Sequence, residues 1–212
     1  MNKLLLIPIL IGIMAIVIFS IVSISSEFIL EPTPSVASGI NFNYSDVENI
    51  QKILATQNIS MSSPVAITDY TVDQYCTFFD DDNVQKFVKY CTTTALVGSD
   101  GQQLGNINMG GSSNEPIMAL ALIEIPFLNS TYGDTDFVFQ TLIETLVCDC
   151  WEEQRPGGFE SVSAWLVAAE KRYDETAQTT IKSKINGLAQ KQLILEITAT
   201  EKSYLWTLII LK

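Results

Sequence analysis

The sequence predicts an α+β fold, in which helices pack on an antiparallel sheet, after an N-terminal transmembrane helix. The first observation is that apolar residues recur at helical spacing in some stretches and form short β-rich runs in others. The second is the order of these runs, because the predicted strands come in groups with helices between them. The third is that residues 4–26 contain no charged side chain.

Residues 4–26 are predicted to form a transmembrane signal-anchor helix in contact with membrane lipid. About 20 successive apolar residues are enough to span the hydrocarbon layer of a bilayer as a helix. Lys3 precedes this run, and Glu27 and Glu31 follow it. The positive-inside rule therefore predicts a single-pass protein of the cell membrane, with residues 1–3 as a cytoplasmic stub and the rest exported.

A cleaved signal peptide is the alternative, because small residues at positions 23–25 and 35–37 form possible cleavage sites. Both interpretations place the following domain outside the cytoplasm. Residues 27–40 contain two prolines and two serines, and we expect them to form an extended Pro/Ser-rich stalk. Residues 41–212 then form one extracytoplasmic α+β domain, since their number suits a single core.

Helical spacing predicts three helices in the first part of this domain: residues 45–57, 71–79 and 84–91. Ser45 and Glu48 form a capping-box pattern at the start of the first helix. The other two helices are expected to present Cys76 and Cys91 toward the core.

Runs rich in β-branched and apolar residues predict five strands: residues 92–97, 102–109, 117–127, 192–199 and 204–211. The first two are joined by Gly98-Ser99-Asp100-Gly101, which has the composition of a hairpin turn. Between the third and fourth strands we expect a helix that begins at Asp134 or Thr135. Its inner face carries Phe139, Leu142, Ile143, Leu146 and Cys150. A longer helical pattern, of one or two helices, then continues from Phe159 to Leu188.

The cysteines are Cys76, Cys91, Cys148 and Cys150, and an even number in an exported domain predicts two disulfides. Disulfide geometry is demanding, so we expect Cys148 and Cys150 to be too close in sequence to pair with each other. Each would then join Cys76 or Cys91 and close a long loop. A thiolate metal site and redox chemistry are the alternatives.

Three triplets match the acceptor pattern for N-glycosylation, at Asn43, Asn58 and Asn129. They are compatible with surface loops of an exterior glycoprotein.

The chain has 24 acidic and 12 basic residues and a net charge of −12, so an acidic surface is expected to repel nucleic acid. Residues 171–212 carry a basic excess, which we expect to pair with acidic neighbours. The sequence contains no histidine, which excludes a Ser-His-Asp triad and imidazole-bound metals. No cofactor is expected.

Several motifs have the composition of functional sites. Asp80-Asp81-Asp82-Asn83 is expected to cap a helix, with calcium binding as the alternative. Residues 110–113 are expected to be a flexible loop, not a phosphate cradle. Asp149, Glu152 and Glu153 could supply a carboxylate pair for glycoside hydrolysis, although adjacent acids after a helix usually face water. The tryptophans are expected to be core or rim anchors: Trp151, Trp165 and Trp206.

The segment from Gly98 to Gly105 resembles the strand-turn-strand of extracellular Cache-type sensor domains. The resemblance covers about a dozen residues, roughly one hairpin. It implies a small-molecule-binding domain, and signalling would need a partner because only residues 1–3 are predicted to stay inside.

The sequence therefore predicts a binding or assembly module on the outer face of the membrane, without enzymatic activity. Such a module would be an accessory subunit of a membrane complex or a cell-surface protein, with a protein partner in or on the membrane. The alternatives are a Cache/PAS-like small-molecule-binding domain and an exported hydrolase that uses carboxylates.

Overall fold

The computed structural model describes residues 41–68, 71–78, 85–126, 133–176 and 178–212. The predicted stub, anchor and stalk, residues 1–40, lie outside this part of the chain, so the predicted membrane span stays a prediction. Within the described ranges, no helix combines the length and the apolar character that a membrane span needs.

The described residues form one antiparallel sheet of eight strands: β1 (Ser60–Met61), β2 (Val65–Thr68), β3 (Tyr90–Val97), β4 (Gln103–Gly111), β5 (Pro116–Pro126), β6 (Thr180–Leu188), β7 (Lys191–Ala199) and β8 (Ser203–Leu211). The strand order is β1-β3-β4-β5-β8-β7-β6, and β2 lies beside β1 as a second partner of β3. This confirms the antiparallel sheet of the predicted α+β fold.

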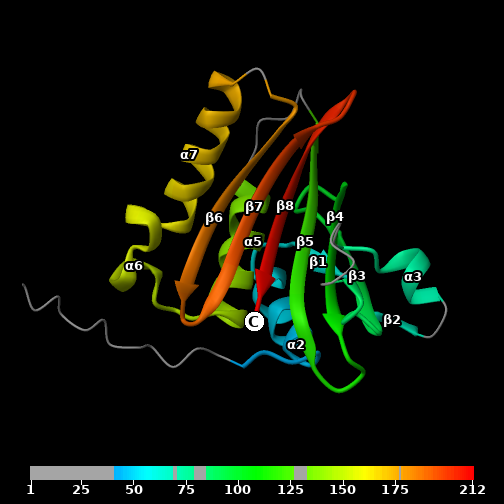
Figure 1. Cartoon of the computed structure of the whole chain (residues 1–212). Helices are drawn as coiled ribbons and strands as arrows, with labels where there is room; N and C mark the ends of the chain where they lie inside the picture. Colours follow the sequence, from blue (N-terminus) through cyan, green and yellow to red (C-terminus); the bar gives the residue numbers. More distant parts are fainter. Residues whose placement is uncertain (1–40, 69–70, 79–84, 127–132, 177) are drawn as a thin grey trace, which may run out of the picture. The chain divides into compact units, whose positions relative to one another are not determined.

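Three long helices lie on one side of this sheet: α2 (Asp46–Ala55), α5 (Gly133–Leu146) and α7 (Val162–Glu175). α5 packs between α2 and α7, and α7 also contacts β6 and β7. Figure 1 shows α2 and α5 behind the strands. The remaining helices are short: α3 (Val72–Tyr75), α6 (Trp151–Gln154) and the 3-10 turn η2 (Pro156–Gly158).

The main core lies between the sheet and these three helices. On β8, the alternate residues Trp206, Leu208 and Ile210 are buried in it, as the two-residue period of a strand requires. α5 contributes the apolar face that the sequence predicted, from Phe139 to Leu146. All three tryptophans are buried in this core, and Trp165 Nε1 donates a hydrogen bond of 2.8 Å to Ser183 Oγ.

A second, smaller core lies on the opposite face of the sheet, over β3 and β4. It consists of Val72, Cys76, Val88 and Cys91, with Ile67 and Phe78 packed against it. Gly110 lies beneath it, where an added Cβ would meet Phe78 and Val88 at 3.2 Å. The chain around α3 therefore covers this end of the face, and the absence of a side chain at residue 110 lets it pack closely.

The predicted helical pattern up to Leu188 is wrong beyond α7, because Ile181 and Ile185 belong to strand β6. A spacing of four residues fits one face of a helix and also one face of a strand. The positions of Ile181 and Ile185 therefore could not distinguish a helix from a strand. Ala189 and Gln190, with φ of 47° and 65°, form the turn that pairs β6 with β7.

Two further local predictions are corrected. Residues 84–91 do not form a helix that presents Cys91, since β3 begins at Tyr90 and Cys91 lies in that strand. Ser45 makes no side-chain cap on α2. Instead, the Asp46 carboxylate accepts a hydrogen bond of 2.7 Å from Asn43 N. The capping contact is therefore made at Asn43, two residues before Ser45.

The disulfides also differ from the prediction, because Cys148 pairs with Cys150 and Cys76 pairs with Cys91. The chain turns between α5 and α6, which brings the Cα atoms of Cys148 and Cys150 to 5.2 Å. That separation lies within the ordinary range for a disulfide. Both bridges therefore close short loops, and the Cys76–Cys91 bridge ties the chain after α3 to β3.

We expect Gly105→Ala to lower the free energy of unfolding by roughly 3 kcal/mol or more. A Cβ at residue 105 would lie 1.9 Å from the carbonyl oxygen of Leu122 on the neighbouring strand. Urea denaturation measures the change. Gly133→Ala is the control, because nothing lies within 4 Å of its added Cβ. Equal stability of the two variants would contradict the close approach of β4 and β5.

Chain prepared with its thiols blocked at lysis should yield two linked peptides, Cys76 with Cys91 and Cys148 with Cys150. Replacing Cys76 and Cys91 by serine should lower the free energy of unfolding by about 3 kcal/mol, and replacing Cys148 and Cys150 by about half as much, because the second loop is shorter. Peptide mapping and urea denaturation check the two statements. A peptide linking Cys76 to Cys148 or Cys150 would refute this pairing.

Candidate functional site

On the face of the sheet opposite the three long helices, no helix of the described residues lies over β8, β7 and β6, and Figure 1 looks onto these strands. The β5 residue Leu120 on this face is buried, whereas Ile209 and Ile194 are half-buried. We call this surface the open face. It consists of the residues that alternate with the core positions and line one groove: Leu120, Leu122, Lys182, Lys184, Ile194, Glu196, Thr207, Ile209 and Leu211. Thr77 and Phe78, after α3, form the groove's wall over β4. The hollow measures about 420 Å³.

The floor of the groove is a continuous apolar strip. The strand register places Leu120 beside Ile209 and Ile209 beside Ile194. As a result β5 and β8 carry apolar residues on both faces. Antiparallel strands with one face in water usually alternate between apolar and polar residues, whereas strands apolar on both faces are usually covered on both. The composition of this face therefore indicates a surface that another segment covers.

Charged residues border the strip along β6 and β7. Lys182 and Glu196 form an ion pair of 2.9 Å, with 53% and 25% of their side chains exposed. Lys184 lies next to Ile194 in the register and is exposed. Lys184 makes no ion pair within the part of the chain that the structure describes. The groove thus offers one unpaired cation at the edge of an apolar surface.

The predicted carboxylate site lies elsewhere, in a cleft of about 220 Å³ beside α6. Asp149, Glu152 and Glu153 line it together with Glu144, whose carboxylate accepts a hydrogen bond of 2.7 Å from Gln140 Nε2. All three predicted acids are exposed, whereas a catalytic acid of the glycosidase kind needs apolar surroundings. Among the described residues, no group of three or more acids and cysteines is arranged to hold a metal ion.

The hairpin that resembles Cache domains is present as β3, its turn and β4, and it borders a cleft of about 320 Å³. The carboxylates of this cleft are bound by the chain itself. Asp134 accepts hydrogen bonds from Ser99 N at 2.8 Å and Ser99 Oγ at 3.0 Å, and Glu124 accepts one from Ser203 Oγ at 2.6 Å. The bonds to Asp134 connect the β3–β4 turn to α5, and the bond to Glu124 connects β8 to β5. Both carboxylates therefore have a structural role.

Asn43 and Asn58 are exposed, so their glycosylation stays a prediction, and Asn129 lies outside the described residues. The predicted helix cap, Asp80-Asp81-Asp82-Asn83, also lies outside the described residues. Gly110 and Gly111 end strand β4 and are not part of a flexible loop, which corrects that prediction.

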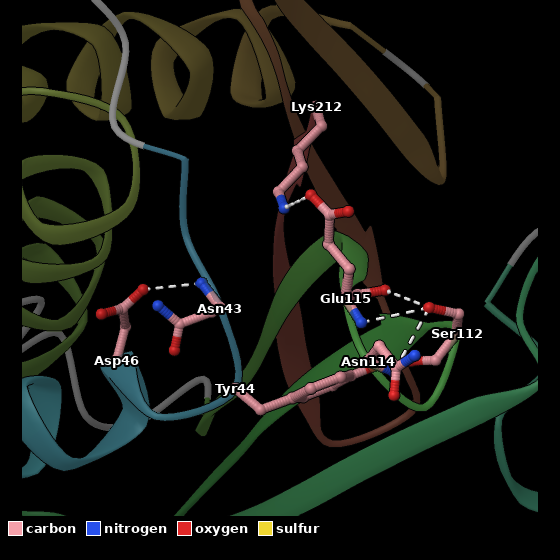
Figure 2. A network of polar contacts seen from close by, with 7 residues as sticks. All are labelled: Asn43, Tyr44, Asp46, Ser112, Asn114, Glu115 and Lys212. Atoms are coloured by element: carbon pink, nitrogen blue, oxygen red, sulfur yellow. Dashed lines mark hydrogen bonds and ion pairs between the residues drawn. The ribbon is translucent and has the colours of Figure 1, made fainter.

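A network of polar contacts holds the start of the described chain against the end of the sheet (Figure 2). Tyr44 donates a hydrogen bond of 2.8 Å to the Ser112 carbonyl in the β4–β5 turn. Burial, and secondarily the neighbouring Tyr90, raises the pKa of the Tyr44 hydroxyl, which remains a donor. Lys212 Nζ lies 2.8 Å from Glu115 Oε1 and 4.8 Å from the ring centroid of Phe42. We call these residues the entry corner.

Lys212 sets the electrostatics of the entry corner. Its hydrogen bond and its charge lower the pKa of the Glu115 carboxyl. Burial, with the charge of Lys212 as a smaller cause, lowers the pKa of the Lys191 ammonium at the start of β7. The entry corner therefore brings two lysines and the start of the domain to the same end of the sheet.

No protein-family model, curated protein or solved structure matches this chain. The functional argument therefore rests on the chain's own residues. Sequence reasoning missed the open face, because it placed Lys182 and Lys184 on a helix. The apolar runs 117–123 and 205–211 were the available signal, since they leave no polar face for water.

Ile209 and Ile210 test the assignment of the two faces, because they are neighbours on β8 and point to opposite sides. We expect Ile209→Lys to change the free energy of unfolding by less than about 1 kcal/mol, since the new ammonium stays in water. Ile210→Lys should cost roughly 4 kcal/mol or more, because it buries an unpaired charge in the main core. Urea denaturation of both variants measures this, and equal losses would contradict an uncovered face.

Proposed function

We propose that this chain is a membrane-anchored extracytoplasmic module that binds a protein partner through the open face and has no enzymatic activity of its own. The single observation that carries the proposal is the continuous apolar strip of Leu120, Ile209 and Ile194, which forms the floor of the groove on the face of the sheet opposite the three long helices. Apolar surface of this kind on a well-packed domain is typical of an interaction site.

Several features support the exterior location. The two disulfides suit an oxidising compartment, where such bridges form and persist. The absence of charge in residues 4–26 supports the anchor.

The dimensions of the open face limit the kind of partner. Four neighbouring strands spaced about 4.8 Å apart span about 15 Å, and the seven residues from Leu205 to Leu211 extend about 20 Å from the first Cα to the last. This area accepts one helix, which is about 10 Å wide, or a pair of extended segments. The partner's contacting segment should be apolar and carry a carboxylate, because Lys184, at the edge of the strip, makes no ion pair with any described residue.

The Cache/PAS-like alternative retains one supporting observation, the volume of the groove. About 420 Å³ falls within the range of small-molecule sites, which is about 300 to 1,000 Å³. A small ligand there would be an anionic amphiphile. The groove is open along the sheet and has few converging polar groups, which favours a macromolecular partner.

The test is a capture experiment from native membranes with the tagged full chain in mild detergent. We expect the wild type and Val167→Lys to recover the same integral membrane proteins, and Ile209→Lys to lose them. Val167 is the matched control, because it is a β-branched apolar residue that is 62% exposed on α7, on the other side of the sheet. Equal recovery by all three chains, or recovery of nothing above an untagged sample, would refute binding through the open face.

A further inference from the structure

A cleft of about 180 Å³ lies on the helix side of the sheet, where the start of α5 meets one face of α7. Asp136 of α5 and Trp206 of β8 line it. α7 contributes residues three or four positions apart, which share one face of a helix: Ser163, Leu166, Val167 and Glu170. This cleft lies on the opposite side of the sheet from the open face, so it has no part in the proposed function.

Asp136 carries a carboxylate oxygen that lacks a partner. Its Oδ2 accepts a hydrogen bond from Ser163 Oγ, whereas its Oδ1 is buried and accepts no hydrogen bond from any described residue. Withdrawing a carboxylate oxygen from water without a partner is costly. Such atoms are uncommon in folded proteins, and a bound water, ion or ligand is the usual explanation.

The charge of the cleft indicates a cation. Neither Asp136 nor Glu170 makes an ion pair with a described residue. Glu170 is half-buried, and Val167, three residues before it, is 62% exposed, so this side of the cleft opens to solvent. A cation would therefore enter past Glu170 and meet Asp136 further inside, where a charge pair is screened less than in water.

The apolar part of the lining decides which class of cation fits. Leu166 and Trp206 are buried side chains of the cleft. Calcium takes about six to eight oxygen ligands, and no group of three or more acids or cysteines in the described part of the chain could hold a metal ion. An apolar cavity of about 150 Å³ holds a benzene molecule. The cleft therefore has room for one ring-sized hydrocarbon group beside its carboxylate.

We propose that this cleft binds a small apolar amine, with Asp136 as the counter-ion of the ammonium group. The ammonium donates to the oxygen that Ser163 leaves free, and the hydrocarbon part lies against Leu166 and Trp206. The terminal torsion of an aspartate is soft, so the carboxylate can turn this oxygen toward the cleft at little cost. Ser163 is a positioning residue, because it holds the other oxygen.

Titration of the full chain in mild detergent with benzylamine, followed by ligand-observed NMR, tests the proposal. Benzylamine joins an ammonium group to a single ring, and benzyl alcohol is the matched neutral ligand. Empty micelles are measured in parallel, so that only binding to the protein is compared. Asp136→Asn removes the counter-ion. Asp174→Asn is the matched control variant, because Asp174 is an exposed acid of α7 outside the cleft and its loss changes the net charge equally.

We expect the wild type and Asp174→Asn to bind benzylamine with a Kd of about 1 mM or below, at least about tenfold more tightly than benzyl alcohol. Asp136→Asn should weaken the binding of benzylamine at least about tenfold and leave that of benzyl alcohol unchanged. Glu170→Gln should weaken the binding of benzylamine severalfold, because Glu170 attracts the cation at the opening. Urea denaturation checks that each variant is folded.

Three results would each overturn the proposal: no saturable binding of benzylamine by the wild type, equal affinity of the wild type for the amine and the alcohol, or undiminished binding of the amine by folded Asp136→Asn. The first two need the wild type alone, so they decide the matter even where a variant is unstable. Ile209→Lys should bind benzylamine as the wild type does, because Ile209 lies on the opposite face of the sheet from Trp206. Failure of amine binding and failure of partner capture are therefore distinguishable.

Discussion

The pairing of β5 with β8 is the constraint on which the rest of the structure depends. Every other described strand pair joins strands from the same part of the chain, whereas β5 and β8 join residues 116–126 to residues 203–211. Through this seam the N-terminal strands and the β6–β7–β8 hairpins become one sheet. The three long helices can then share a single core, because the seam presents Ala121, Ile123, Trp206 and Leu208 to them without interruption.

The same seam explains why the open face is apolar. The strands at the middle of a wide sheet lie far from its edges, and here both are built from apolar residues on each side. The helices cover one side, and the segment around α3 packs on the opposite side over β3 and β4. The Cys76–Cys91 bridge fixes that cover at the β3 end. Among the described residues, the groove from β5 to β6 therefore begins where this segment ends.

The fold class, α2, α5, the β3–β4 hairpin, β5 and the last two strands could be predicted from the sequence, because their apolar periods were unambiguous. β6 could not, since Ile181 and Ile185 satisfy both periods and only the core-facing Ser183, bound by Trp165, favours the strand. The Cys148–Cys150 bridge depends on a backbone turn that spacing alone does not reveal. The open face could be recognised only once residues 180–188 were known to form a strand, because its two lysines come from β6.

Charge decides which segments the open face can accept. The chain is strongly acidic, so an acidic segment is repelled over most of the surface. As the sequence predicted, lysines of the basic stretch pair with acids, since Lys171, Lys182 and Lys212 make the three ion pairs of the described residues. Lys184 lies among them without such a partner and directly beside the strip. A carboxylate that approaches the strip is therefore attracted at Lys184, because salt screens the distant acids over about 8 Å while a contact pair is screened much less.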